Sequence, residues 1–504
     1  MKKLSYYQEP RLAFRFDQQM QDPRDGLSLF GPLDRAKPEG IRWAVIGPSD
    51  AVGRMKRWVE KIQGQIVSGN DLVARPIFPG FEAAFNTKLS TDPVHEEIVD
   101  EQRLYKHACN EDPHQRVYRS VSMYADRIIN RTRTEDVVPD VWCVVIPEYI
   151  FQRERPRSQV PLEERIAPDI RLNPSKEREA SGSYLFPQYN EMAKEYEYEV
   201  HFHNQLKARL LKSQIPTQII RETTIAHNDF LDARGNPTRP LGNLESAIAW
   251  NIATALFYKS GGRPWKLGAA REGVCYIGLV FKQVNESKRK GTACCAAQMF
   301  LDSGDGVVFK GAVGPWVSEK PGDFHLDKQS AKQIVEMCVQ AYSERKGGIP
   351  EELFIHGRTR YSDEEWDGFV EGAGSRTKII GIRLREAKEL KLFRNGDFPV
   401  LRGVAFPTGE KSGYLWTRGM SARLRTYPGR EVPNPINVEI CRGDADIKTV
   451  MEDILALTKL NYNSCSFGDG MPVTLKFANA VGEILTAGPT RELNVPPLPF
   501  KYYI

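Results

Sequence analysis

Four polar side chains between positions 203 and 259 are of the types that bind a terminal phosphate. His203 and Lys207 are four residues apart, so they would share one face of a helix. Gln218 follows Pro216 on a β-prone segment, and Lys259 ends a second predicted helix that the following glycines stop. If these elements converge, an imidazole, an amide and two ammonium groups would meet, and such a set of donors suits a phosphate.

Two helices and one strand must position these groups. Leu206, Leu210 and Leu211 recur at helical spacing, the strand covers 218–220, and the second helix covers 245–258. A plainer interpretation stays open from these residues alone, because a His and a Lys at this spacing also occur on solvated helix faces. A glutamine on a strand is equally ordinary.

Composition sets wide bounds on what the chain does. It has 504 residues, enough for two or three domains, and 41% of them are hydrophobic, enough for real cores. Lys plus Arg number 70 and Asp plus Glu 65, and the net charge of +5 is compatible with nucleic-acid binding without requiring it. The 8 cysteines form no CxxC pair and the 8 histidines show no zinc spacing, which favours reduced thiols in a cytoplasmic protein. The first residues lack a signal peptide's apolar core, and no apolar run reaches the ~20 residues of a membrane span, so no membrane is expected.

Alternation of strands and helices in the first half of the chain predicts a parallel, Rossmann-like α/β sheet. A strand at 41–47 precedes a helix with an apolar face, and a continuously apolar strand occupies 137–147. No GxGxxG motif is present, so no dinucleotide site is inferred. Residues 151–198 are rich in charge, Pro and Gly, and we expect an exposed insertion. Its Arg-rich half could contact nucleic acid, although a solvated loop is the simpler interpretation.

The second half of the chain begins with apolar strands. They cover 274–284, 294–301 and 307–314, and the last two are predicted to form a hairpin. Helices are predicted near 328–345 and 446–459, with further strands between them. Strands first and mixed strand–helix units afterwards predict a ribonuclease H-like fold.

Short motifs in the first half, found together and in order, resemble the MID domain of Argonaute proteins. They are DPRDGLSLFGPL at 22–33, FHNQLKARLL at 202–211, IPTQIIRE at 215–222 and FYKSGGRPWKL at 257–267. The resemblance implies that His203, Lys207, Gln218 and Lys259 hold the 5′ phosphate of a nucleic-acid guide. His203 stands where a tyrosine is more usual, and Ala255 stands where many relatives carry another polar or basic residue, so one contact fewer is expected.

The second half resembles the PIWI domain, a ribonuclease H-like nuclease whose clustered carboxylates hold two Mg²⁺ ions. Val280 falls at the first ligand position, His356 at the second and Asn479 at the last. Valine cannot coordinate a cation, so the resemblance implies a PIWI domain that does not cleave nucleic acid. Other carboxylates, none of them at a matching position, are Asp302, Asp305 and Asp363.

Taken over its whole length, the chain resembles the short prokaryotic Argonautes, which consist of MID and PIWI alone. It divides into a linker at 1–40, a MID domain at 41–265 and a PIWI domain at 266–504. The resemblance implies a guide RNA with a 5′ phosphate, a complementary single-stranded DNA target and a TIR–APAZ or Sir2–APAZ partner. That partner would hydrolyse NAD⁺ once DNA of an invading plasmid or phage is bound, causing abortive infection. A guide-directed nuclease and a guide-dependent binding module without signalling are the alternatives.

The end of the sequence carries one further expectation. The last residues, ending in Tyr502, Tyr503 and Ile504, are largely aromatic or apolar, which by itself indicates only a packed tail. In Argonautes the final carboxylate lies beside the guide phosphate and helps to hold a divalent ion. The resemblance therefore implies that the carboxylate of Ile504 and the phosphate share a Mg²⁺ ion, which bridges such oxygens well.

Overall fold

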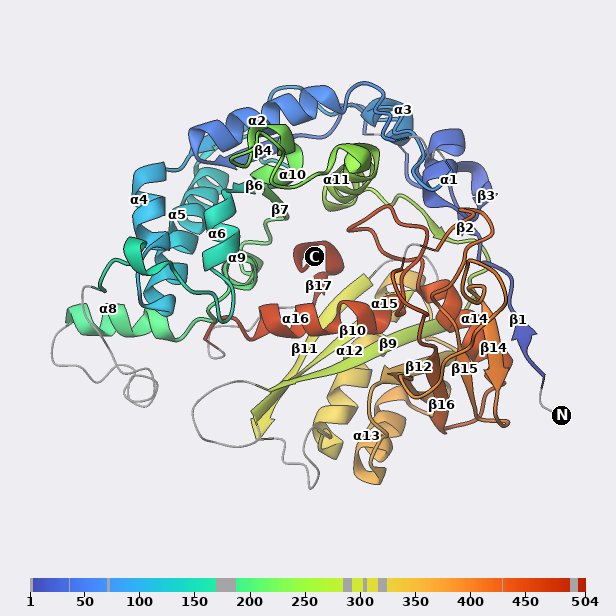
Figure 1. Ribbon diagram of the computed structural model, residues 1–504. Coiled ribbons are helices and arrows are strands. Elements are labelled where there is room, and N and C mark those ends of the chain that lie inside the picture. The colour runs from blue at the N-terminus through green and yellow to red at the C-terminus, as the bar shows by residue number, and fades with distance from the viewer. Residues whose placement is uncertain are drawn as a thin grey trace.

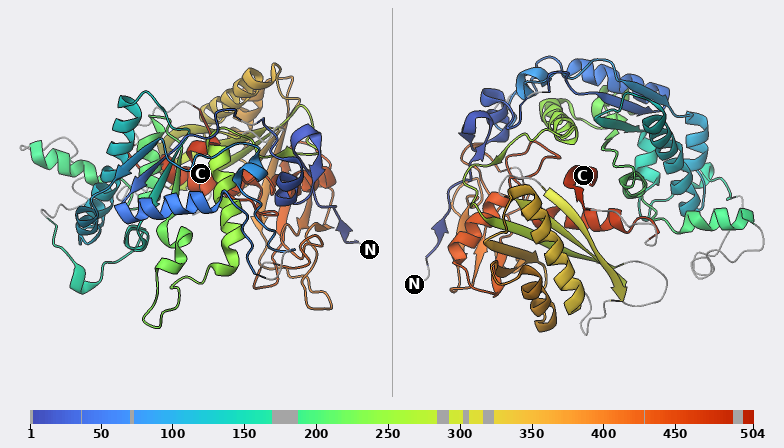
Figure 2. Two further views of the ribbon diagram at one scale, coloured as in Figure 1. Left: turned by 90° about the horizontal axis from the view of Figure 1, so that it is seen from above. Right: turned by 180° about the vertical axis from the view of Figure 1, so that it is seen from behind.

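The structure is built on two large β-sheets with helices on their faces (Figure 1). This computed structural model describes residues 3–35, 37–69, 73–168, 187–283, 292–301, 306–315, 324–427, 429–489 and 497–504. Elements from the first half of the chain form an arch above the ten-stranded sheet, and the end marked C lies between them in both front and rear views (Figures 1 and 2). Within these ranges no helix has both the length and the apolar character needed to span a membrane.

The first half of the chain forms a sheet of four parallel strands in the order β5-β4-β6-β7. The strands are β4 (Trp43–Gly47), β5 (His95–Ile98), β6 (Val141–Ile146) and β7 (Thr217–Arg221). Every residue of β4 and β6 is buried, as expected for central parallel strands covered on both faces. The predicted Rossmann-like α/β sheet is confirmed.

Helices cover both faces of this sheet. On one face lie α2 (Ser49–Lys61) and α11 (Glu245–Lys259), and on the other lie α5 (Pro113–Thr134) and α9 (Phe202–Leu211). The other helices of this half are α1 (Pro23–Phe30), α3 (Phe81–Phe85), α4 (Glu101–Ala108), α6 (Glu148–Arg153), α8 (Pro187–Tyr196) and α10 (Glu222–Ile225). Strand β7, which carries Gln218, is thus the edge strand next to β6, and the two helices that carry the predicted lysines, α9 and α11, lie on opposite faces of the sheet.

The second half supplies most of a sheet of ten strands in the order β1-β14-β15-β16-β13-β12-β9-β10-β11-β17. These are β1 (Ser5–Tyr6), β9 (Val274–Gln283), β10 (Thr292–Leu301), β11 (Gly306–Pro315), β12 (Glu352–Gly357), β13 (Lys378–Glu386), β14 (Val404–Pro407), β15 (Ser412–Leu415), β16 (Ile436–Arg442) and β17 (Leu498–Pro499). Strands β9, β10 and β11 pair antiparallel, and β12 and β13 then add in parallel on the other side of β9. This order confirms the predicted ribonuclease H-like fold.

Two groups of helices cover this second sheet. They are α12 (Lys328–Lys346) and α13 (Asp363–Ala373) in one group, and α14 (Ile447–Leu457), α15 (Val473–Lys476) and α16 (Ala478–Leu485) in the other. The first group shares a core with Cys275, Ile277 and Ile355, whereas the second shares the core that contains Tyr276 and Phe354. Alternate residues of β9 therefore face opposite helical layers, as a two-residue strand period requires.

The N-terminal segment is part of the folded structure. Strand β1 pairs with β14, and a small sheet joins β2 (Leu12–Ala13) and β3 (Gln19–Met20) to β8 (Lys266–Leu267). Glu9 forms ion pairs with Arg402 at 2.9 Å and with Lys459 at 2.8 Å. Residues 5–20 are thus anchored along the second half of the chain, whereas Arg24 and Lys37 bond to Ala74 and Asp140 of the first half. The domain boundaries at 40 and 265 stay a prediction.

The expectation of an exposed insertion at 151–198 is wrong for several of its residues. Those that are buried include Arg153, Glu154, Glu195 and Tyr196. A charged residue is buried when it finds a partner, and Glu195 pairs with Arg119 of α5 at 3.0 Å. The centre of the insertion, 169–186, lies outside the described residues.

Candidate phosphate-binding site

Helix α9, strand β7 and the end of helix α11 bring two lysines together. Lys207 lies on the buried face of α9 and is 2% exposed, and Lys259 is the last residue of α11 and is 1% exposed. Both ammonium groups donate to one backbone oxygen, the carbonyl of Thr217 at the start of β7, at 2.7 Å from Lys207 and 2.9 Å from Lys259. The lysines are therefore held side by side although their positions are 52 residues apart in sequence (259 − 207).

Two more of the predicted residues join this cluster. The Oε1 atom of Gln218 accepts a hydrogen bond from Lys259 at 2.7 Å. The main-chain oxygen of Ile504 accepts one from Lys207 at 2.7 Å, and Ile504 itself is 6% exposed. The last residue of the chain therefore lies in the site, and the C-terminus is between the arch and the ten-stranded sheet (Figure 1).

The electrostatics of this lysine cluster are unfavourable without a ligand. No Asp or Glu side chain of the described residues forms an ion pair or hydrogen bond with Lys207 or Lys259. Burial lowers the pKa of Lys207 to about 7. Burial, followed by the neighbouring charge of Lys207, lowers the pKa of Lys259 well below its ordinary value. The shared acceptor, the carbonyl of Thr217, is neutral, and the end of the chain at Ile504 is the one negative group beside these two buried cations among the described residues, so an added anion would stabilise the site.

His203 lies one helical turn before Lys207 but hydrogen-bonds elsewhere. Its Nδ1 atom is 3.1 Å from Oδ1 of Asn204, and it forms no hydrogen bond with Lys207, Gln218 or Lys259. Burial, followed by the charge of Lys207, lowers the pKa of His203 to about 3, so the ring is neutral at pH 7. The structure therefore joins Lys207, Gln218, Lys259 and Ile504 directly, and leaves His203 at the margin as a neutral donor.

The acceptor shared by both lysines is a backbone carbonyl, that of Thr217, which the sequence does not mark as a functional group. The carbonyl of Thr217 receives both lysines, and a backbone oxygen has no residue type to mark it. Its only signal is position, because Thr217 directly precedes Gln218 on the strand between the two helices.

The three positions at which metal ligands are predicted to be missing lie on the second sheet and the helices that cover it. His356 is 1% exposed at the end of β12, and its Nδ1 atom is 2.9 Å from the hydroxyl oxygen of Thr474 on α15. Burial lowers the pKa of His356 to about 3. Val280 lies on β9, where its backbone pairs with Ala296, and Asn479 lies on α16, but the side chains of both are outside the described part of the structure.

Helix α15 approaches β9 closely at this position. A Cβ atom on Gly278 would lie 1.9 Å from the carbonyl oxygen of Thr474, so only glycine fits there. In the part of the chain that the structure describes, no group of three or more His, Cys, Asp or Glu side chains could hold a metal ion. His356 and Thr474 therefore form a neutral, hydrogen-bonded contact at the second of the three positions.

Comparisons with known proteins find a similar fold in Argonaute proteins. No family model matches the chain. The Argonaute protein of Aquifex aeolicus (strain VF5) is 21% identical over 287 residues, which are 56% of this chain and 36% of that protein. The structure of Clostridium butyricum Argonaute bound to a guide DNA and a 19-mer target DNA superposes with a TM-score of 0.61 and 16% identity, covering 97% of this chain and 53% of that one. Drosophila Piwi gives a TM-score of 0.59 and 12% identity, covering 99% of this chain and 56% of that one.

These similarities establish the fold. The chain is a mixed α/β protein with an Argonaute-like fold that matches the MID–PIWI architecture. It spans just over half the length of the matched structures, at 53% and 56%, and 36% of the curated relative.

Proposed function

We propose that this chain holds the 5′ phosphate of a guide RNA at Lys207, Gln218 and Lys259, and presents the guide for pairing with complementary single-stranded DNA. The observation that carries the proposal is a pair of buried ammonium groups that pair with no carboxylate side chain of the described residues. A phosphate would supply two negative charges and several acceptor oxygens at that point. His203 would add one hydrogen bond from a neutral ring.

Sequence specificity would come from base pairing and not from the protein. The protein needs only to hold the backbone and the shape of the guide–target duplex, as other guided effectors do. The Clostridium butyricum protein is described with a guide and a target strand bound, and the shared fold supports a similar use of the MID–PIWI framework here.

A magnesium ion fits the same site. The Ile504 oxygen lies in the lysine cluster, and Mg²⁺ prefers oxygen ligands of the kind that this residue and a phosphate would provide. When bound, the ion would offset the repulsion between the phosphate and the end of the chain.

We further propose that the chain recognises its target without cutting it. His356 is neutral and hydrogen-bonded to Thr474, and α15 fills the space beside Gly278, which supports a structural role for this position. A sensor that does not cleave needs a partner to act. A cytoplasmic TIR–APAZ or Sir2–APAZ protein that hydrolyses NAD⁺ on recognition of invading DNA is the partner proposed, with abortive infection as the outcome.

The phosphate site is tested with the double variant Lys207→Met/Lys259→Met. Each charge-assisted hydrogen bond contributes about 1.5–3 kcal/mol, so loss of two weakens binding of 5′-phosphorylated RNA by about a hundredfold or more. Binding of 5′-hydroxyl RNA should change far less. A matched control, Lys194→Met/Lys212→Met, removes two exposed lysines of the same region and should bind like wild type. A double variant that still prefers phosphorylated RNA as wild type does would contradict the assignment.

Two further measurements separate the sensor from its alternatives. Guide-loaded protein is incubated with complementary DNA or RNA and Mg²⁺ or Mn²⁺, and a discrete cut opposite the guide would favour the nuclease. The chain is also co-expressed with a TIR–APAZ or Sir2–APAZ protein, and NAD⁺ is measured with guide alone and with guide plus target. If the complex forms but NAD⁺ stays intact with both strands bound, a binding module without signalling is the better description.

A further inference from the structure

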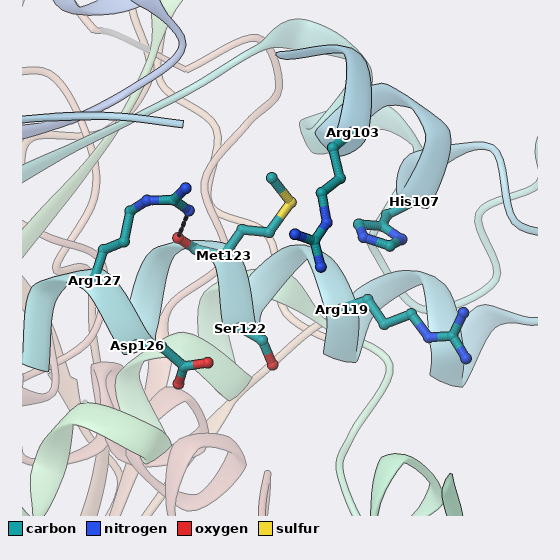
Figure 3. Close-up of a pocket in the computed structure, with 7 residues that line it drawn as sticks. All are labelled: Arg103, His107, Arg119, Ser122, Met123, Asp126 and Arg127. Carbon is teal, nitrogen blue, oxygen red and sulfur yellow. Dashed lines mark hydrogen bonds between the residues drawn. The ribbon is translucent and has the colours of Figure 1, made fainter. Parts of the chain in front are cut away.

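A cavity of about 450 Å³ lies between helices α4 and α5 (Figure 3). These two helices lie on the flank of the arch (Figure 1). Figure 3 shows Arg103 and His107 reaching from α4 toward α5, whose side chains form the opposite wall. Volumes of a few hundred cubic ångströms are typical of sites for small ligands.

The spacing of the lining residues explains why the cavity between α4 and α5 is polar. Arg103 and His107 are four residues apart, so they share one face of α4. Arg119, Ser122, Asp126 and Arg127 recur on α5 at intervals of three, four and one, which also gives one face. The two helices also share an apolar core, in which Leu104 and Ala108 of α4 are buried with Val121 of α5, and the basic side chains lie beside this contact.

The charges of this α4–α5 cavity do not balance internally. Arg119 pairs with Glu195 at 3.0 Å, and Asp126 pairs with Arg209 of α9 at 2.9 Å. Arg127 donates to the carbonyl oxygen of Met123 at 2.9 Å and forms no ion pair with a described residue. The guanidinium of Arg103 forms neither an ion pair nor a hydrogen bond with the described residues. In the part of the chain that the structure describes, two arginines that line one cavity thus have no negative partner.

The cavity is separate from the lysine cluster. Arg209 follows Lys207 by two residues, which is about 200° around a helix, so the two side chains leave opposite sides of α9. Accordingly Arg209 donates to the Ser122 hydroxyl at 2.7 Å, whereas Lys207 donates to Thr217 at 2.7 Å.

We propose that the α4–α5 cavity binds the phosphate group of a second ligand, either a mononucleotide or the terminal phosphate of a short oligonucleotide. A guanidinium presents two parallel N–H donors that match two phosphate oxygens, and Arg103 and Arg127 provide two such forks from opposite walls. The Ser122 hydroxyl lies in the same wall as a further polar contact. This site does not depend on the proposed guide pocket.

The test uses protein that already carries Lys207→Met/Lys259→Met, so that the lysine cluster contributes nothing. Binding of AMP and of a 5′-phosphorylated tetranucleotide is measured by calorimetry, with adenosine and the 5′-hydroxyl tetranucleotide for comparison. Both phosphorylated probes, or one of them, should bind, and neither unphosphorylated probe should. Tighter binding of AMP identifies a mononucleotide site, and tighter binding of the tetranucleotide identifies a strand end.

Adding Arg103→Gln/Arg127→Gln should weaken that binding at least about tenfold, as expected for loss of charge-assisted hydrogen bonds. The matched control Lys106→Gln/Arg133→Gln removes two exposed charges from the same helices outside the cavity and should leave binding unchanged. Thermal melting of each variant confirms that it is folded. Equal affinity in the cavity variant and its control, or binding of a pentaglutamate peptide in preference to both phosphorylated probes, would overturn the proposal.

Discussion

The buried lysines of the lysine cluster, Lys207 and Lys259, have different partners from Lys459, the buried lysine that follows α14. Lys459 has a fully buried side chain, but Glu9 lies 2.8 Å away and is shared with Arg402 at 2.9 Å. Burial lowers the pKa of Lys459 to about 8, and the charge of Glu9 opposes that fall. Among the described residues, Lys207 and Lys259 donate to two neutral oxygens, of Thr217 and Gln218, and to the end of the chain.

This difference in partners indicates that Lys459 has a structural role, whereas Lys207 and Lys259 are available to bind a ligand. A buried ion pair is complete in the folded chain, so its lysine holds the N-terminal segment against the second half. An unbalanced pair of cations lowers the stability of the unliganded protein, and this is the arrangement expected where binding supplies the missing charge. The contrast leads to four predictions.

The largest expected effect concerns stability. Lys459→Met leaves Glu9 buried with Arg402 alone, and breaking a buried pair costs about 3–5 kcal/mol. Lys207→Met/Lys259→Met removes two like charges from the interior and should leave the free energy of unfolding unchanged or higher. Urea unfolding of both variants without guide, at pH 7, measures the difference. A lysine-pair variant that loses as much stability as Lys459→Met would show that the cluster is structural.

The fold was largely predictable because the spacing of hydrophobic residues indicates which segments form strands and which form helices. The buried run of β6 and the apolar face of α2 predicted a parallel sheet, and both are present. Strand β16 was not predicted, although Ile436, Val438 and Ile440 alternate with less buried residues as a strand requires.

The candidate site was predictable only in part. Residue types and their order indicated Lys207, Gln218 and Lys259, because a helix end and a neighbouring helix face can be read from sequence. The role of Thr217 could not be read, since its carbonyl acts through position alone. The α4–α5 cavity was equally hidden, because it depends on how two helix faces meet and α4 had not been predicted.

The second prediction concerns the end of the chain. Ile504 is 6% exposed and its oxygen accepts from Lys207, so three residues appended after it would displace that oxygen. Affinity for 5′-phosphorylated RNA should fall about tenfold to a hundredfold, the equivalent of one charge-assisted hydrogen bond. EDTA should weaken wild-type binding to a similar degree if Mg²⁺ is shared there. The same tripeptide at the N-terminus is the control, and unchanged affinity together with indifference to EDTA would remove Ile504 from the site.

The third prediction concerns His356, the neutral histidine at the second of the predicted ligand positions. Burial lowers the pKa of His356 to about 3, whereas a histidine in the unfolded chain titrates near about 6.5. Between these values the unfolded chain binds the extra proton, so stability contributed by His356 is present above pH 6.5 and is lost as pH falls. At pH 5.5 the loss is about 1.4 kcal/mol.

His356→Met has no proton to bind, so its stability should fall less steeply between pH 7.5 and 5.5. Because His203 is present in both proteins, the difference between their urea midpoints at the two pH values isolates His356. Identical pH dependence of the variant and wild type would mean that His356 is not held neutral by burial. His356 would then not serve as an example of a buried neutral group to set against the buried charged lysines.

The smallest effect is expected at His203, a neutral ring that lies in the same proposed site as the two charged lysines. Its ring is neutral at pH 7 because burial and the charge of Lys207 lower its pKa to about 3. A neutral hydrogen bond contributes about 0.5–1.5 kcal/mol, so His203→Phe should weaken 5′-phosphorylated RNA only about twofold to tenfold. Lys207→Met should cost more, because it removes a charged donor.

Salt dependence distinguishes the two roles more sharply than affinity does. For single strands the slope of log affinity against log salt falls by about 0.7 for each phosphate charge that the protein neutralises. Lys207→Met should therefore flatten the slope measured between 50 and 300 mM KCl (~sixfold range). His203→Phe should leave the slope equal to that of wild type, because a neutral ring neutralises nothing. A slope flattened by His203→Phe would show that the bound phosphate draws a proton onto the ring, and His203 would then join Lys207 and Lys259 as a third cation of the site.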